Sequence, residues 1–142
     1  MITATMDKFR FLLGNWNLEY RIPESFFSPA GSDSGTGSIS RALNDKYVIF
    51  EYSTATGSEA KGIFAWDEKI KAYRYWWFEN SGNFLTATCN FINDEILAMN
   101  WHDTLLVQTF TKEDNDKIVL KMLHPGEKGG YDPVLEVVMK RK

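Results

Sequence analysis

The feature that most restricts the fold of this chain is a succession of ten short segments with strand-like patterning. In the first, residues 15–22, the apolar side chains of Trp16, Leu18, Tyr20 and Ile22 alternate with polar ones. A period of two is typical of a strand that buries one face. The other nine segments are predicted at about 36–43, 46–54, 59–67, 71–79, 84–92, 95–101, 104–113, 117–124 and 133–141.

The connections between these segments are short and rich in turn-forming residues, such as those at 44–45, 80–83 and 113–116. Strands that follow one another through short hairpins form antiparallel, up-and-down sheets. An open sheet of ten strands leaves two unpaired edges, and closure removes them. The length of 142 residues is also typical of one domain. We therefore predict an all-β protein in which residues 1–142 form a single antiparallel barrel of about ten strands.

Two segments depart from the strand pattern. Residues 6–13 are predicted to form a short helix on an apolar surface, and Gly14 follows its end. Residues 23–36 are rich in Pro, Gly and Ser, so we predict a long, flexible loop that carries Phe26 and Phe27. The stretch "GSDSGTG" within this loop lacks the lysine and the following helix of a phosphate-binding loop. Long loops in compact domains often serve as lids or portals.

The order of these elements resembles that of lipocalin-like (calycin) barrels. The resemblance lies in "FLLGNW", where a short apolar helix is followed by Gly14-x-Trp16 at the start of the first strand. It implies that the helix closes one end of the barrel and that Trp16 packs beneath it against a basic side chain. The stretches "YVIFEY", "GIFAWDEKIKAYRYWWF" and "NSGNF" are similar to those of an uncharacterised family of small bacterial calycin-like proteins. That resemblance implies a fold and no catalytic residues.

A related family of heme-binding barrels begins in a similar way but depends on a histidine near its C-terminus. His124 is the only residue of this chain in a comparable place, and its surroundings, "KMLHPGEKGG", do not resemble the ending of that family. We therefore predict no cofactor.

Composition and charge exclude several classes of function. The net charge is −3 and the basic residues are scattered, whereas nucleic-acid binding usually requires a basic surface. No segment approaches the roughly 18 apolar residues of a membrane-spanning helix, and the first residues lack the pattern of a signal peptide. These observations predict a cytoplasmic protein without a nucleic-acid or membrane partner. The single cysteine, Cys89, lies inside a predicted strand and is expected to be a small buried apolar side chain.

Catalytic and metal-binding patterns are also absent from the sequence. His102 and His124 have no partners at metal-ligand spacing, and we expect His102 to face solvent in a turn beside Asp103. Paired carboxylates inside the barrel are conceivable, with Glu19, Glu51 and Glu79 as candidates. However, Glu19 and Glu51 alternate with apolar residues and are expected to point outward. Since no acid–base pair can be placed on one inward face, a small barrel enzyme is the weakest hypothesis.

The face that contains Trp16 is taken as inward, and it defines the candidate interior. Its expected companions include Val48, Phe50 and Tyr52; Leu97, Met99 and Trp101; and Ile118, Leu120 and Met122. In "RYWWF", residues 74–78, both faces are apolar, so either Tyr75 and Trp77 or Trp76 and Phe78 point inward. The alternation does not decide between them.

Barrels of this size are either filled by their own side chains or hold one small ligand, and the sequence leaves both open. Our leading hypothesis is a lipocalin-like protein that binds a small apolar or aromatic molecule, with Arg74 or Arg41 near its polar end. The candidate ligand-binding residues are Tyr20, Phe26, Phe27, Phe50, Tyr52, Tyr75, Trp77, Met99, Trp101, Leu120 and Met122, with Phe26 and Phe27 at the portal.

The aromatic residues of "RYWWF" that do not face inward need a cover. The cover is either the helix, the long loop or a second subunit, because soluble monomers rarely expose large apolar patches. We predict a homodimer that pairs through Arg74, Trp76 and Phe78. A ligand-free structural module that acts as such a dimer is the alternative to the ligand-binding hypothesis.

The last prediction concerns the closure of the barrel. In lipocalin-like barrels the first strand pairs with the last, so Trp16 should approach residues 137–141. Leu135, Val137 and Met139 share one face of that strand, and Arg141 continues the face. We therefore predict that Arg141 lies over the indole of Trp16, with Gly14 at the same structural site.

Overall fold

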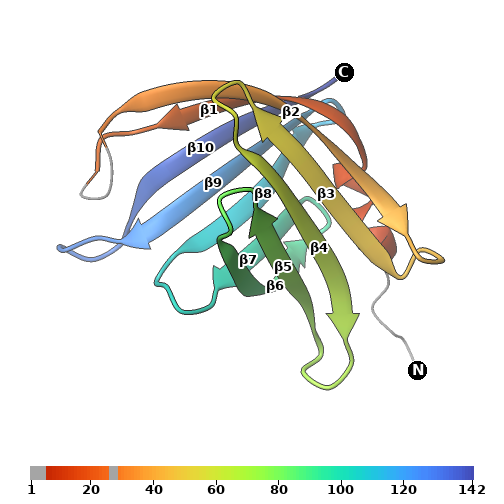
Figure 1. Cartoon of the computed structure of the whole chain (residues 1–142). Coiled ribbons are helices and arrows are strands. Elements are labelled where there is room, and N and C mark those ends of the chain that lie inside the picture. Colours follow the sequence, from red (N-terminus) through yellow and green to blue (C-terminus); the bar gives the residue numbers. More distant parts are fainter. Residues whose placement is uncertain (1–5, 26–28) are drawn as a thin grey trace.

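The computed structural model describes residues 6–25 and 29–142. It contains one short helix followed by ten strands (Figure 1). The elements are η1 (Met6–Leu12), β1 (Gly14–Ile22), β2 (Gly31–Ala42), β3 (Tyr47–Thr54), β4 (Glu59–Asp67), β5 (Ala72–Glu79), β6 (Phe84–Asn93), β7 (Ile96–Trp101), β8 (Val107–Asp114), β9 (Lys117–Pro125) and β10 (Tyr131–Arg141).

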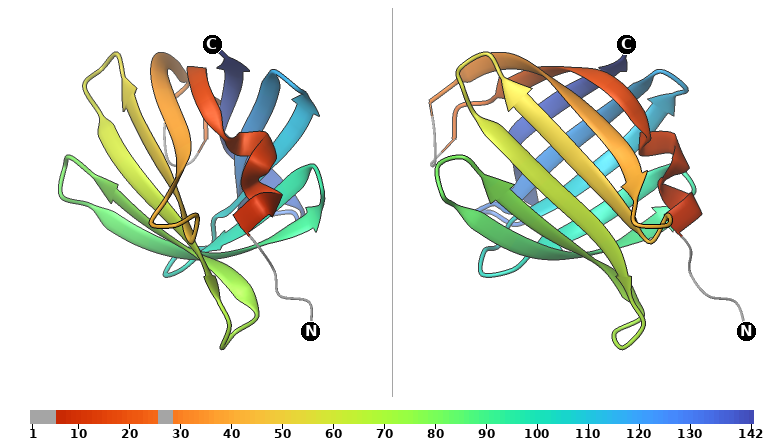
Figure 2. Two further views of the ribbon diagram at one scale, coloured as in Figure 1. Left: turned by 90° about the vertical axis from the view of Figure 1, so that its right-hand side faces the viewer. Right: turned by 45° about the vertical axis from the view of Figure 1, so that its right-hand side comes forward.

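The ten strands form one closed antiparallel barrel, which confirms the predicted fold class. Each strand pairs with its neighbours in the sequence, and β1 also pairs with β10 to close the sheet. At the closure Trp16 lies opposite Arg141 and Leu18 lies opposite Met139. Figure 2 shows β1 and β10 side by side and the strands wound around a common axis. Among the described residues no helix is long and apolar enough to cross a membrane.

The short helix η1 is a 3₁₀ helix that covers one end of the barrel (Figure 2, left). Its buried residues are Met6, Phe9 and Leu12. This spacing of three matches the three residues per turn of a 3₁₀ helix, so all three side chains lie on one stripe. The helix therefore inserts an apolar edge into the barrel end, as the sequence pattern predicts.

Strand β2 corrects the prediction of a long flexible loop over residues 23–36. The glycine-rich stretch belongs to β2, which begins at Gly31, and its residues 31–39 pair with the whole of β1. Glycine is usually disfavoured in strands, but here the inner face of β2 has little space for side chains. A Cβ atom at Gly37 would lie 2.9 Å from the ring of Phe50. Gly37 thus makes room for the Phe50 ring of β3, and Gly35 allows the close approach of the β3 backbone at Ser53.

The orientation of β5 resolves the ambiguity of the aromatic segment. Tyr73 and Tyr75 are buried inside the barrel, and Trp77 follows them on the same face. Trp76 and Phe78 are on the outer face, where Phe78 remains 47% exposed. The inward face of the predicted interior is therefore the one that carries Tyr75 and Trp77.

Candidate ligand-binding site

The half of the barrel next to η1 is filled by aromatic side chains. The Phe9 ring lies 4.8 Å from the Phe64 ring, 5.1 Å from the Tyr73 ring and 5.0 Å from the Phe91 ring. Phe9 and Phe64 have no exposed surface. Edge and tilted contacts at these distances are favourable for aromatic pairs. This end of the interior is therefore a solid core, and it forms the floor of any cavity.

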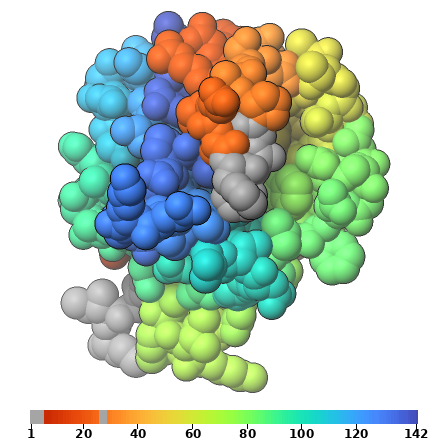
Figure 3. Space-filling view, turned by 90° about the vertical axis from the view of Figure 1, so that its left-hand side faces the viewer, coloured from red at the N-terminus to blue at the C-terminus, as the bar shows by residue number. Residues whose placement is uncertain are grey.

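The other half of the barrel contains a cavity of about 430 Å³. This volume lies within the range of about 300–1,000 Å³ that is usual for small-molecule sites. Figure 3 looks onto this end, which is bordered by the start of β2, the β5–β6 turn, the loop after β7 and the β9–β10 turn. Eight of the predicted ligand-binding residues line the cavity: Tyr20, Phe50, Tyr52, Tyr75, Trp77, Trp101, Leu120 and Met122. The sequence left a filled interior and a cavity as alternatives. The structure has both, with a filled half next to η1 and a cavity in the opposite half.

Three predicted residues do not line the cavity. Met99 is buried in the filled core instead. It precedes Trp101 by two residues on the inward face of β7, so it lies closer to the filled end of the barrel. Phe26 and Phe27, predicted at the portal, lie outside the described residues.

A glycine on β4 creates part of the space that the aromatic residues need. Gly62 lies opposite Trp77 in the strand pairing, and a Cβ atom at this position would overlap the hydroxyl of Tyr75. The Tyr75 side chain thus extends across β4 with its ring against Phe64, at 4.3 Å between ring centres. Gly62 therefore sets how far the Tyr75 ring extends along the cavity wall.

Two indole nitrogens donate hydrogen bonds to side chains of the cavity wall. Trp77 Nε1 donates to the hydroxyl of Tyr52 at 2.8 Å, and Trp101 Nε1 donates to Oε1 of Gln108 at 3.0 Å. Each bond satisfies an indole N–H that faces the interior, where an unpaired donor would be costly. Both bonds also fix the orientation of the side chain that accepts them.

Burial keeps the tyrosines of the cavity uncharged. The pKa of Tyr20 is raised mainly by burial and further by the nearby Tyr52 and Asp33. The pKa of Tyr52 is raised by burial and by Glu79, against the opposing effect of the bond from Trp77. The fully buried Tyr75 has a pKa well above its usual value for the same main reason. A tyrosine with the usual pKa of about 10 is already protonated at neutral pH, and burial extends this state to more alkaline pH. These side chains therefore offer hydroxyl groups to a ligand.

The charged groups of the cavity are two carboxylates. Asp33 accepts hydrogen bonds from the hydroxyl of Thr56 at 2.6 Å and from the backbone N–H of Ser34 at 2.8 Å, and these bonds lower its pKa. Glu79 also lines the cavity and accepts a bond from Ser81 Oγ at 2.6 Å. Among the described residues that line the cavity there is no lysine, arginine or histidine. The site is therefore apolar with a negative edge.

This charge pattern corrects two expectations. Arg74 was expected near a polar end of the ligand, but it points outward and pairs with Asp67 at 2.6 Å. Arg41 is at the η1 end, where it pairs with Asp7 at 2.7 Å. Conversely, Asp33 and Glu79 share the inward face, although no such pair was expected. The reason is that residue 33 was assigned to a loop, whereas it belongs to β2.

The structural site at Trp16 has the arrangement that the sequence predicts. The guanidinium of Arg141 lies 4.2 Å from the centre of the Trp16 ring. It also donates to the carbonyl oxygens of Leu13 at 2.6 Å and Asn115 at 3.2 Å. Gly14 has a φ of +132°, and a Cβ atom there would overlap the guanidinium. These contacts therefore join the end of η1 to β1 and β10.

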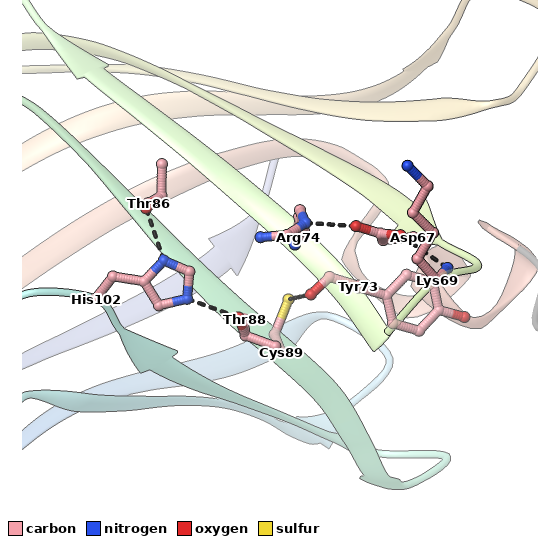
Figure 4. A network of polar contacts seen from close by, with 8 residues as sticks. All are labelled: Asp67, Lys69, Tyr73, Arg74, Thr86, Thr88, Cys89 and His102. Carbon is pink, nitrogen blue, oxygen red and sulfur yellow. Dashed lines mark hydrogen bonds and ion pairs between the residues drawn. The ribbon is translucent and has the colours of Figure 1, made fainter. Parts of the chain in front are cut away.

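The outer faces of β5 and β6 carry polar side chains, among them Arg74, Thr86 and Thr88 (Figure 4). His102 was expected to face solvent, but it is half-buried, and its two ring nitrogens are 2.7 Å and 2.6 Å from the hydroxyls of Thr86 and Thr88. Cys89 is buried within the core, as expected, and burial raises the pKa of its thiol to about 12. In the described part of the chain no group of three or more His, Cys, Asp or Glu residues could hold a metal ion.

Sequence reasoning missed several residues of the cavity. The polar ones are Asp33, Thr54, Ser58 and Gln108, and the apolar ones include Leu85 and Leu106. Leu18, Ile22, Leu135, Val137 and Met139 also line the cavity; they were placed on the faces of Trp16 and Arg141 but not named as ligand-binding residues. The alternation of "VQTFTK" could have placed Gln108 on the same face as the buried Phe110. No comparable signal marks Asp33, because its neighbours are Gly and Ser.

Comparisons with known proteins support the fold and do not assign a family. No protein-family model matches the chain, and no curated protein matches its sequence. The crystal structure of Rv2717c from M. tuberculosis is similar over 99% of this chain and 99% of that chain, with 11% identity and a TM-score of 0.65. A de novo designed fluorescence-activating β-barrel covers 100% of both chains at 12% identity, but its TM-score is only 0.44. The similarity to Rv2717c supports the closed ten-stranded barrel as the fold.

Proposed function

We propose that this protein binds a small, largely apolar molecule in the cavity at the end of the barrel opposite η1. The observation that supports this proposal is the cavity itself, which occupies about 430 Å³ above a filled aromatic core. A barrel needs no such space for stability, since voids in a core lose packing contacts. The neighbouring half of the same interior is filled.

The lining favours an uncharged or positively charged ligand with an aromatic body. Trp77, Trp101 and Phe50 provide flat apolar surfaces, whereas Asp33 and Glu79 give the edge of the cavity a negative potential. A carboxylate ligand, such as a fatty acid, would have to approach these carboxylates without a cation to pair with. Fatty acids are therefore poor candidates for this site.

The test is the binding of Prodan, an uncharged naphthalene ketone whose emission shifts to the blue in apolar surroundings. We expect saturable binding to the wild-type protein at a ratio of one per chain. Leu120→Trp should abolish binding because it places an indole inside the cavity. Lys121→Trp is the matched control, since the next side chain of β9 is exposed on the outer surface.

The folded state of both variants is checked by circular dichroism and by the melting temperature. If Leu120→Trp is destabilised, Met122→Trp, on the same inward face, takes its place. The proposal fails if wild-type protein shows no saturable binding of Prodan, or if folded cavity variants bind it as tightly as Lys121→Trp does.

Pairing of two copies is a separate proposal, and the outer face of β5 supports it. Phe78 is 47% exposed and Phe84 is 69% exposed, with 6.5 Å between their ring centres. The helix η1 lies at the barrel end and does not cover this face (Figure 2). The double variant Phe78→Ser/Phe84→Ser should sediment as a monomer if the wild-type protein is a dimer. Leu105→Ser, an equally exposed apolar residue elsewhere, is the control.

Membership of the small bacterial calycin-like proteins and a cytoplasmic location also belong with the proposals. The contact of Arg141 with Trp16 behind the Gly14-x-Trp16 motif supports the first. Localisation of a fluorescent fusion in the native host would test the second.

A further inference from the structure

Gln108 stands out among the residues of the cavity wall because it is polar and almost completely buried. It is on the inward face of β8 with 5% of its surface exposed. Among the described residues, Gln108 is the one polar or charged residue that is buried. Burial of an amide is costly unless both of its polar ends have partners. The partners of this side chain therefore indicate its role.

The bond from Trp101 fixes which way the amide of Gln108 points. The indole N–H can only donate, so the atom 3.0 Å from Trp101 Nε1 must be the amide oxygen of Gln108. The NH₂ group is then directed away from Trp101. Because the side chain is held in this way, it cannot reverse without leaving the indole N–H unpaired.

The side chain of Gln108 makes one hydrogen bond within the described part of the chain, and its oxygen accepts that bond. The NH₂ group therefore has no acceptor among the described residues. In the same part of the chain, no enclosed side-chain nitrogen or oxygen lacks a hydrogen-bond partner. An unpaired NH₂ group must therefore reach open space, and the space that Gln108 lines is the cavity. The protein thus presents a fixed amide donor inside an apolar chamber.

We infer that Gln108 is a specificity-determining residue that donates a hydrogen bond to an acceptor atom of the ligand, and that Trp101 positions it. The ligand class is thereby narrowed to uncharged or cationic aromatic molecules that carry a carbonyl or similar acceptor at their inner end. This inference rests on the proposed function of the cavity. A site with a buried donor discriminates strongly against analogues that cannot pair with it, because the donor then stays unsatisfied.

The experiment compares two ligands of nearly the same shape, 2-acetylnaphthalene and 2-isopropenylnaphthalene. The first has a carbonyl oxygen where the second has a CH₂ group. Affinities are measured by displacement of Prodan. We expect wild-type protein to bind the ketone about 5- to 30-fold more tightly than the alkene.

Two variants test the assigned roles. Gln108→Met preserves the side-chain volume without a donor, so the ratio of the two affinities should fall to about one. Trp101→Phe removes the N–H that orients the amide, and it should also reduce the ratio. The ratio is informative because a purely structural effect would change both affinities together.

A measurement on wild-type protein avoids any dependence on variant folding. The carbonyl group of ¹³C-labelled 2-acetylnaphthalene should have a lower infrared stretching frequency when the ligand is bound to the protein than when it is dissolved in an alkane. The inference is overturned if the stretch matches the alkane value, if wild-type protein binds both ligands equally, or if Gln108→Met retains the preference for the ketone. If neither ligand binds and Prodan does not bind, it is the proposed function that fails.

Discussion

Replacement of Arg141 by Met tests how the barrel is closed. The variant keeps an apolar stem of similar length but loses the guanidinium, which lies 4.2 Å from the Trp16 ring centre. An interaction of a cation with an aromatic ring contributes about 0.5–2 kcal/mol. The guanidinium also donates to the carbonyl oxygens of Leu13 at 2.6 Å and Asn115 at 3.2 Å. Hydrogen bonds that involve a charged group contribute about 1.5–3 kcal/mol each when they are shielded from water.

The expected loss has to be discounted because the Arg141 side chain is 30% exposed. Water can replace part of the lost bonds, and the ion pair with Asp116 at 3.5 Å contributes little since Asp116 is 79% exposed. We therefore expect Arg141→Met to lower the free energy of unfolding by about 2–4 kcal/mol. For a chain of this length that corresponds to a decrease of roughly 6–12 °C in melting temperature.

The assay is urea unfolding followed by far-ultraviolet circular dichroism. Trp16→Leu and the double variant complete a cycle in which the coupling between the two side chains should be about 0.5–2 kcal/mol. Trp16→Ala is the harsher change. It removes a fully buried ring and its bond to the Leu12 carbonyl at 2.9 Å, and should cost about 3–5 kcal/mol or more. A loss below about 0.5 kcal/mol for Arg141→Met would refute the reasoning, because typical surface changes have effects of that size.

Three further predictions concern the interior. Gly62→Ala should destabilise the barrel by about 1–3 kcal/mol, since its methyl group meets the hydroxyl and the ring carbons of Tyr75. In urea unfolding the cost should be much smaller in a Tyr75→Ala background, which removes the whole ring, and an equal cost in both backgrounds would contradict this. Burial raises the pKa values of Tyr73 and Cys89 to about 12, so the unfolded chain loses these protons first and stability should fall as the pH rises from about 9 towards 12. A urea midpoint that is constant from pH 8 to pH 11 would disprove it. Finally, 2-naphthoate should bind more weakly than 2-acetylnaphthalene, and Glu79→Gln should narrow the difference, as measured by Prodan displacement at low salt; equal affinities would argue against a negative edge.

The outline of the barrel could be predicted from sequence because alternation and turn residues report directly on strands. The contact between Trp16 and Arg141 follows from the same pattern, since counting by two along the first and last strands places both on the inner face. The start of β2 could not be predicted in this way. Its glycines have no side chains to alternate, and the need for glycine comes from the neighbouring strand, where the Phe50 ring lies against Gly37 and the Ser53 backbone lies against Gly35.

The candidate site was less predictable than the fold. Alternation could not orient Tyr75 and Trp76, because both faces of β5 are apolar and the choice depends on neighbours such as Gly62. Whether the interior is filled depends on how aromatic rings from different strands pack against one another. The pattern of residues within one strand does not determine this packing. The role of Gln108 depends on its bond to Trp101, which lies on another strand.

The pairing of β1 with β10 has a consequence for how the molecule is made. Trp16 and Arg141 are separated by almost the whole described chain, yet they meet at the seam of the barrel. Contacts between such distant residues slow folding because a long segment must be ordered before they form. During synthesis β1 has no final partner on one edge until β10 leaves the ribosome. Until then the exposed edge and the aromatic interior are open to other chains, so unfinished barrels should be prone to aggregation when many chains are made at once.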